Sequence, residues 1–126
     1  MQKQSANQIR RIEELQHYVR SLDHIKKLVA ELESNRAARP KIIDSICANI
    51  ARELSHMRQR ALNANLGTLP DVAGSLALVA NRAGTGIAMK VRALADGVNS
   101  MTMQLDQSLK MAHEAPPEKD KEKNQS

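Results

Sequence analysis

The sequence predicts an all-α protein, an up-and-down helical bundle of four helices, from two observations. Apolar residues recur at steps of three and four over long stretches, which is the spacing of one face of an α-helix. These residues are almost all aliphatic, since the 126-residue chain contains one Tyr and neither Phe nor Trp. Aliphatic side chains fill the narrow space between helices well, whereas the wide cores of other compact folds usually rely on aromatic bulk.

The clearest helical signal lies between residues 87 and 112. Its apolar positions repeat at a mean spacing near 3.5 residues and are Ile87, Val91, Leu94, Val98, Met101, Leu105, Leu109 and Ala112. No charged or titratable residue occupies this stripe, so we expect the helix to contribute packing and to leave any chemistry to the turns and outer faces. Such a stripe needs a cover, which the two upstream segments with the same periodicity can provide.

The first helix is expected to begin at a Ser5 or Asn7 cap and to continue to about Ser34. Its apolar stripe consists of Leu15, Tyr18, Leu22, Ile25, Val29 and Leu32. Ile12 and Val19 widen this stripe beyond what a single internal contact requires. We therefore expect the first helix to be the surface that a partner or a second copy would cover.

The second helix is expected to follow a turn at residues 34–40, because proline fits the first position of a helix. It would continue to about Asn65, with an apolar face made by Ile43, Cys47, Ile50, Leu54, Met57 and Ala61. Cys47 lies on this face, so we expect a buried thiol that acts as a small apolar residue. A single cysteine also excludes an internal disulfide and suits a reducing compartment.

The third helix is expected to start near Pro70, after a break that contains Gly67. Thr68 and Asp71 have the spacing of a capping box, with Asp in the place of Glu. The segment Gly84-Thr85-Gly86 leaves two alternatives open. A turn there gives four helices, which we favour, whereas a tolerated irregularity gives three helices with a long C-terminal one, at a cost of about 1 kcal/mol for each glycine inside a helix.

The chain divides into a helical bundle domain at residues 1–113 and a charged tail at residues 114–126. The tail has nothing apolar to bury, so we expect it to be disordered. The start of the sequence lacks the apolar segment of a signal peptide, and the longest apolar run, residues 76–80, is far too short to cross a bilayer. These observations favour a soluble protein with a cytoplasmic location.

One pair of motifs raises the question of metal chemistry. Glu14-x-x-His17 and Glu53-x-x-His56 have the spacing found in di-metal bundles, where residues three apart on a helix bind one metal. Both motifs flank the apolar stripes and differ in height, and the other helices supply no matching carboxylates. We therefore favour a protein with no metal site, no cofactor, no catalytic residues and no enzymatic activity, and a metal-dependent bundle enzyme ranks third among the functions considered.

A cationic end of the bundle is the strongest candidate for a binding site. If four helices run up and down, the turns near residues 36–41 and 82–90 lie at the same end. The cations gathered there would be Arg36, Arg39, Lys41, Arg82 and Lys90. The chain carries a net charge of +5, so these residues are candidates for binding phosphate groups of nucleic acid or of an anionic membrane.

Two classes of function follow from these features. The first is a non-catalytic helical interaction protein, such as an adaptor, chaperone or assembly subunit, that binds a partner protein or itself through amphipathic helix faces. The alternative is a small basic protein that binds nucleic acid or an anionic membrane through the cationic end. In either case self-association could complete the bundle, and no small-molecule substrate is inferred.

Overall fold

The computed structural model describes residues 5–114 and shows a bundle of four helices in this part of the chain. The helices are α1 (Ala6–Ser34), α2 (Pro40–Ala61), α3 (Leu69–Asn81) and α4 (Ile87–Glu114). The predicted all-α fold with four helices is therefore confirmed. The tail predicted over residues 114–126 lies outside the described residues except for Glu114, which is the last residue of α4.

The connection between α3 and α4 is a true turn, so the three-helix alternative is wrong. Helix α3 ends at Asn81, and Arg82 has the extended backbone angles φ −69° and ψ 124°. Gly84 has φ +81°, in the left-handed region where a side chain would be strained. The glycine that weakens a continuous helix thus provides the conformation that reverses the chain.

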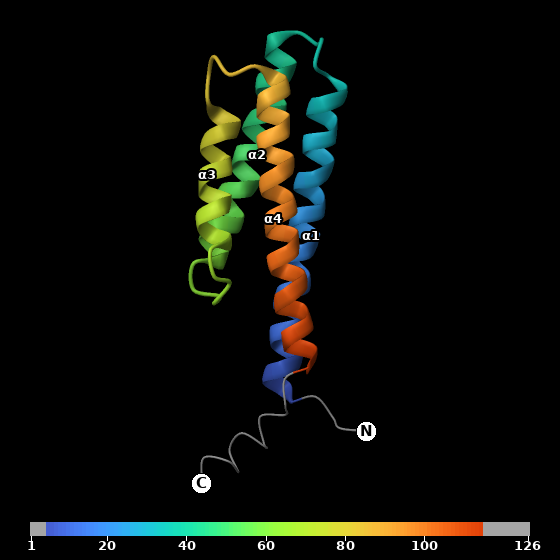
Figure 1. Cartoon of the computed structure of the whole chain (residues 1–126), viewed down its shortest axis with the longest axis vertical. Helices are drawn as coiled ribbons and strands as arrows, with labels where there is room; N and C mark the ends of the chain where they lie inside the picture. The colour runs from blue at the N-terminus through green and yellow to red at the C-terminus, as the bar shows by residue number, and fades with distance from the viewer. Residues whose placement is uncertain (1–4, 115–126) are drawn as a thin grey trace.

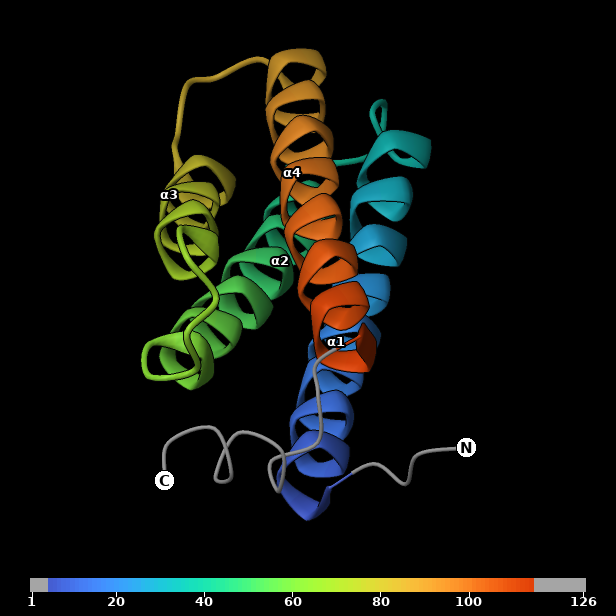
Figure 2. The ribbon, with the colours of Figure 1, turned by 60° about the horizontal axis from the view of Figure 1, so that its bottom comes forward.

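The four helices alternate in direction and form two close pairs. Figure 1 shows α1 and α3 ascending and α2 and α4 descending. Helix α1 packs mainly against α4, and α2 packs mainly against α3, while smaller contacts join α1 to α2 and α3 to α4. Figure 2 shows that α2 is inclined to the α1–α4 pair. Each helix therefore has two neighbours, and one face of each remains free.

The core consists of the aliphatic stripes predicted from the sequence. On α4 the buried members of its stripe are Val91, Leu94, Val98, Met101 and Leu105, while Ile87, Leu109 and Ala112 are partly buried against the core. Cys47 is buried as predicted. Ile12 is buried and Val19 is half-buried, because α1 packs against both α2 and α4. The wide stripe of α1 is thus used inside the chain, contrary to the expectation that it would remain for a partner.

Side chains of α1 and α4 hold the lower ends of their neighbours. Gln8 Nε2 donates to the carbonyl oxygen of Ala112 at 2.8 Å, and Arg11 Nη1 donates to that of Ala64 at 2.6 Å. The bond to Ala112 satisfies a carbonyl group that the end of α4 leaves without an intrahelical partner, whereas the bond to Ala64 ties α1 to the α2–α3 connection. Thr68 does not form the predicted capping box, since its side chain makes no hydrogen bond to the start of α3, and its Oγ1 accepts one from Gln104 Nε2 at 3.0 Å.

Helix boundaries otherwise follow the sequence closely. The Ser5 hydroxyl oxygen accepts a hydrogen bond from the backbone N–H of Gln8 at 3.0 Å and caps α1 as predicted. Helix α2 ends at Ala61, earlier than the predicted Asn65, and Asn65 adopts a positive φ of 55°. No helix in residues 5–114 is long and apolar enough to cross a membrane.

Candidate functional site

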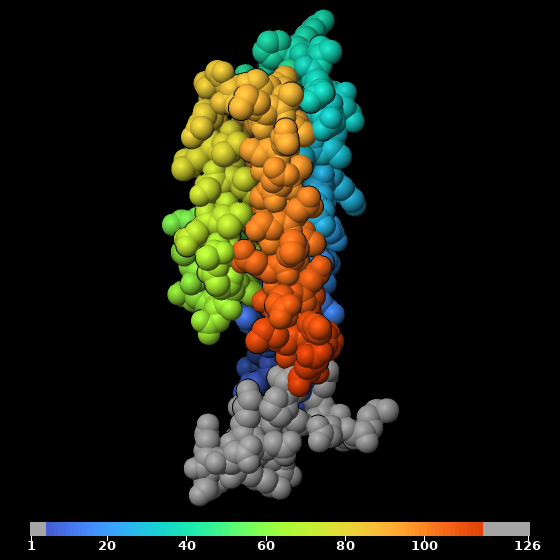
Figure 3. Space-filling view, viewed as in Figure 1, coloured from blue at the N-terminus to red at the C-terminus, as the bar shows by residue number. Residues whose placement is uncertain are grey.

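Two connections meet at the upper end of the bundle as drawn in Figure 1. One is the α1–α2 connection at residues 35–39, and the other is the α3–α4 connection at residues 82–86. The alternating helix directions bring them together, as the sequence predicted. In the space-filling view of Figure 3, the α1–α2 connection projects furthest at this end. The upper end is therefore accessible from outside the bundle.

Four of the five predicted cations are exposed at this end: Arg36, Arg39, Lys41 and Arg82. Arg36 Nη1 lies 4.0 Å from Glu33 Oε1, at the limit of an ion pair between exposed side chains. In the described part of the chain the other three cations form no ion pair. Their charge is thus available to an external anion.

Lys90 does not belong to this exposed group. Only 9% of the residue is accessible, and its Nζ atom donates to the carbonyl oxygen of Arg82 at 3.0 Å. Lys90 Nζ also lies 4.0 Å from Cys47 Sγ. Lys90 directly precedes Val91 of the apolar stripe, and its side chain is directed towards α2 and the α3–α4 connection. The inner side of α4 therefore carries a charge, whereas the sequence predicted none.

The positive charge of the described chain is concentrated in one segment. Residues 5–114 contain 15 Lys and Arg against 11 Asp and Glu. Outside residues 36–60 the two signs balance at nine each, so this segment carries the whole excess of four positive charges. Its cations are Arg36, Arg39, Lys41, Arg52, Arg58 and Arg60, which together we call the basic surface. Its acidic residues are Asp44 and Glu53.

Helix α2 spreads the basic surface down the side of the bundle. Lys41 and Arg52 lie on its outer face, where the residues between and beyond them are the small, exposed Ser45, Ala48 and Ser55. From Lys41 to Arg60 the helix is about 28 Å long at a rise of 1.5 Å per residue. Sequence reasoning that looked only at the turns missed the α2 cations. The local excess of Lys and Arg over acidic residues in this segment was the signal that could have found them.

Two cations flank this outer face. The Arg58 side chain lies over Gly74 of α3, because its Cδ atom is 2.9 Å from the place that a Cβ of residue 74 would take. Arg60 faces α1, where its Nη1 donates a hydrogen bond to His17 Nε2. The basic surface therefore reaches from the α3 side of α2 to its α1 side.

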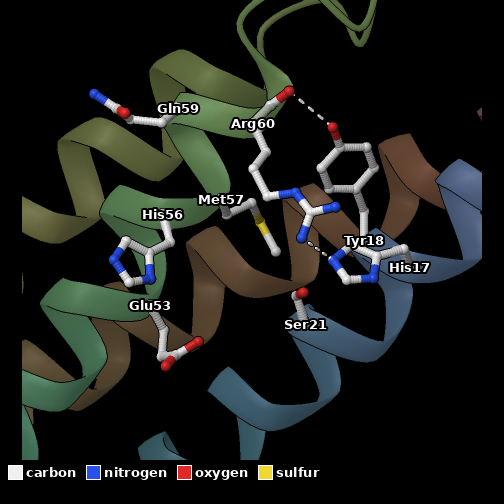
Figure 4. A pocket seen from close by; sticks show the side chains of 8 residues that line it. All are labelled: His17, Tyr18, Ser21, Glu53, His56, Met57, Gln59 and Arg60. Carbon is white, nitrogen blue, oxygen red and sulfur yellow. Dashed lines mark hydrogen bonds between the residues drawn. The ribbon is translucent and has the colours of Figure 1, made fainter.

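The two Glu-x-x-His motifs meet only in part. A cavity of about 380 Å³ lies between α1 and α2, and its lining includes His17, Glu53 and His56 (Figure 4). Glu14 does not line it and forms an ion pair with Arg11 at 2.9 Å. Within residues 5–114 no group of three or more His, Cys, Asp or Glu side chains is arranged to hold a metal ion.

Arg60 lines this cavity and contributes to the electrostatics of His17. Partial burial, together with the charges of Arg60 and Arg20, lowers the pKa of His17 below its ordinary value. Neutral His17 can accept the hydrogen bond that Arg60 donates. The Tyr18 hydroxyl donates to the carbonyl oxygen of Arg60 at 2.9 Å. These contacts join α1 to the last turn of α2 and are structural.

The arrangement offers two features with chemical potential, an exposed basic surface on α2 and a buried lysine beneath the α3–α4 connection. No protein-family model matches this chain, and neither curated proteins nor solved structures show a significant similarity to it.

Proposed function

We propose that this protein is a non-catalytic binding protein that attaches to the phosphate backbone of double-stranded nucleic acid through its basic surface. The observation that carries the proposal is the charge distribution, since residues 36–60 hold the whole positive excess of the described chain. Arg39, Lys41, Arg52 and Arg58 form no ion pair within residues 5–114. Their release of counterions from a polyanion would supply the affinity.

The shape of the basic surface favours a linear polyanion. Its cations extend over about 28 Å of α2, counted at 1.5 Å per residue, which matches several successive phosphates of a duplex. The small side chains Ser45, Ala48 and Ser55 allow the helix to approach a backbone closely. The chain's single aromatic residue, Tyr18, is buried, so stacking on unpaired bases contributes nothing. We therefore expect binding without sequence preference.

Docking of a partner protein on an apolar helix face has less support. The large apolar residues that remain exposed are Ile9, Ile42, Leu62, Leu78, Met89, Met103 and Met111. They are distributed over all four helices and the α2–α3 connection, and singly exposed apolar residues are normal on soluble domains. An acidic partner protein would use the same cations as nucleic acid, and competition distinguishes the two.

The experiment is a salt series of fluorescence-anisotropy titrations with a labelled mixed-sequence DNA duplex. The test variant is R52E/R58E, and the matched control is R20E/R92E, which changes the net charge equally at exposed positions on α1 and α4. We expect the test variant to lose binding and the control to retain it. The logarithmic salt slope should fall by about 0.9 for each phosphate contact removed.

Two outcomes would overturn the proposal. Equal losses in the test and control variants would show that net charge alone drives the association. Retention of the wild-type protein by vesicles of anionic lipid, with no affinity for duplex at low salt, would assign the basic surface to a membrane instead.

A further inference from the structure

A second cavity lies at the upper end of the bundle, and its lining includes none of the cations of the basic surface. Its volume is about 540 Å³, within the range of small-molecule sites. The start of α2, the end of α3, the α3–α4 connection and the first turn of α4 form its walls. Its chemically relevant lining residues are Asp44, Cys47, Arg82, Thr85 and Lys90.

Lys90 brings a buried positive charge to this cavity. Its ammonium group has three N–H donors, while the described part of the chain provides two contacts, the Arg82 carbonyl oxygen at 3.0 Å and Cys47 Sγ at 4.0 Å. No carboxylate lies within ion-pair distance in residues 5–114. Lys90 is largely buried and its ammonium group has no counter-charge among these residues, so it would attract an anion that enters the cavity.

The thiol beside Lys90 does not provide the missing negative charge. Burial raises the pKa of Cys47, and the nearby carboxylate of Asp44 adds to this effect against the opposing influence of Lys90. Cys47 is therefore a neutral thiol near pH 7. Asp44 is exposed at the cavity and is the one acidic residue in its lining.

The backbone around the cavity adds to its positive potential. Pro40 begins α2 and Ile87 begins α4, and both residues line the cavity. The N-terminal ends of the two helices carry the positive ends of their dipoles. The C-terminal end of α3 carries the negative end of its dipole. Lys90 lies against this end, because it donates its hydrogen bond to the carbonyl oxygen of Arg82. The exposed Arg82 lines the same cavity and adds a further cation.

We propose that this cavity binds a small molecule carrying a carboxylate or phosphate group, with the Lys90 ammonium as the main partner of the oxyanion. The ligand would take the donor of Lys90 that has no partner in the described chain. Arg82 is placed to contact the same anion or the remainder of the ligand. This site is distinct from the nucleic-acid surface, because none of the six cations of the basic surface lines the cavity.

The test uses the full chain with inorganic phosphate and acetate as probes, each titrated against chloride at constant ionic strength. Thermal unfolding and the amide NMR signals of residues 84–87 report binding. We expect the midpoint temperature of unfolding to rise, and the amide NMR signals to shift, until the site is saturated with the probe. K90M should weaken binding about tenfold or more, because hydrogen bonds to charged groups are among the strong ones. R92M, at an exposed position on α4 outside the cavity, is the matched control and should bind as the wild type does.

A second variant covers the case in which K90M fails to fold. D44N removes the acidic residue of the cavity at an exposed position, so it should tighten phosphate binding several-fold. The proposal is overturned if neither probe gives a saturable response, or if D44N binds no better than the wild type. Should Lys90 serve only to hold the Arg82 carbonyl, K90M would lower the midpoint equally with and without phosphate. R52E/R58E should keep its response to phosphate, which separates this site from the basic surface.

Discussion

The side chain of Leu76 on α3 fills the space that a Cβ atom at Gly97 of α4 would occupy. Leu76 Cδ2 and Cγ lie 2.6 and 2.8 Å from that position, closer than real Cβ contacts. A glycine within a helix costs about 1 kcal/mol relative to alanine. Here the absence of a side chain lets the two helices approach, so packing outweighs the helix preference.

We expect G97A to destabilise the protein, although alanine favours the helix. The added methyl group would push Leu76 from its site, and overpacking of this kind costs about 1–3 kcal/mol. Urea unfolding followed by circular dichroism measures the loss. The midpoint should fall while the slope of the transition stays unchanged.

G74A is the matched control, because Gly74 also lies inside a helix. A Cβ there would meet Arg58 Cδ at 2.9 Å and Nε at 3.1 Å, in a flexible, exposed side chain that can move away. We expect G74A to be neutral or to stabilise by up to about 1 kcal/mol. Equal destabilisation by both substitutions would contradict the assigned role of Leu76.

The sequence predicted the helices well because their stripes depend on local periodicity. The core positions of α4 from Val91 to Leu105 are buried as expected, and the turn at Gly84 forms where two glycines oppose a helix. Both features depend on residues that are near one another in the chain. The shared end of the two connections then follows from alternating directions alone.

Lys90 shows why the candidate site was predicted only in part. Its place next to Val91 put it beside the stripe, but which side of α4 faces the α3–α4 connection depends on how four helices are arranged around one another. Periodicity does not encode that arrangement. Its partner is a backbone carbonyl, which no side-chain motif reveals. The cations of α2 were not predicted for a different reason, because they lie along the face of a helix and not at a turn.

The contact of Arg11 with the α2–α3 connection leads to a second prediction. Arg11 donates to the carbonyl oxygens of Ala64 and Asn65 at 2.6 and 3.2 Å. R11M should expose these groups and speed amide hydrogen exchange in residues 62–68. A stability loss of about 1–3 kcal/mol is expected, since bonds to a charged donor are removed. R10M, at an exposed neighbouring arginine, should leave the exchange rates unchanged. Similar acceleration in both variants would indicate a general effect of charge on α1.

Tyr18 provides a clean spectroscopic test, because it is the chain's single tyrosine. Burial, followed by the charge of Glu14, raises the pKa of Tyr18 above its ordinary value. The phenolate absorbance should therefore appear at higher pH in the folded protein than in urea. Because the folded pKa is raised, the associated stability is present below the ordinary value and is lost as the pH rises through the folded one. Identical titration curves in both states would contradict the burial of its hydroxyl against Arg60.

His17 is expected to lower the stability of the protein as the pH becomes acidic. Partial burial, then the charges of Arg60 and Arg20, lower its pKa from the ordinary value of 6.5. The unfolded chain thus binds a proton at His17 more readily than the folded chain does, so stability is retained above 6.5 and decreases as the pH falls below it. Protonation also removes the acceptor for Arg60.

The measurement is a urea midpoint series from about pH 7.5 to about pH 5.5, above the range in which ordinary carboxylates titrate. H17Q offers an oxygen acceptor to Arg60 without titrating, so it should flatten the pH dependence. An unchanged slope in H17Q would show that other groups determine the acid sensitivity, and that the hydrogen bond between α1 and the last turn of α2 does not depend on a neutral histidine.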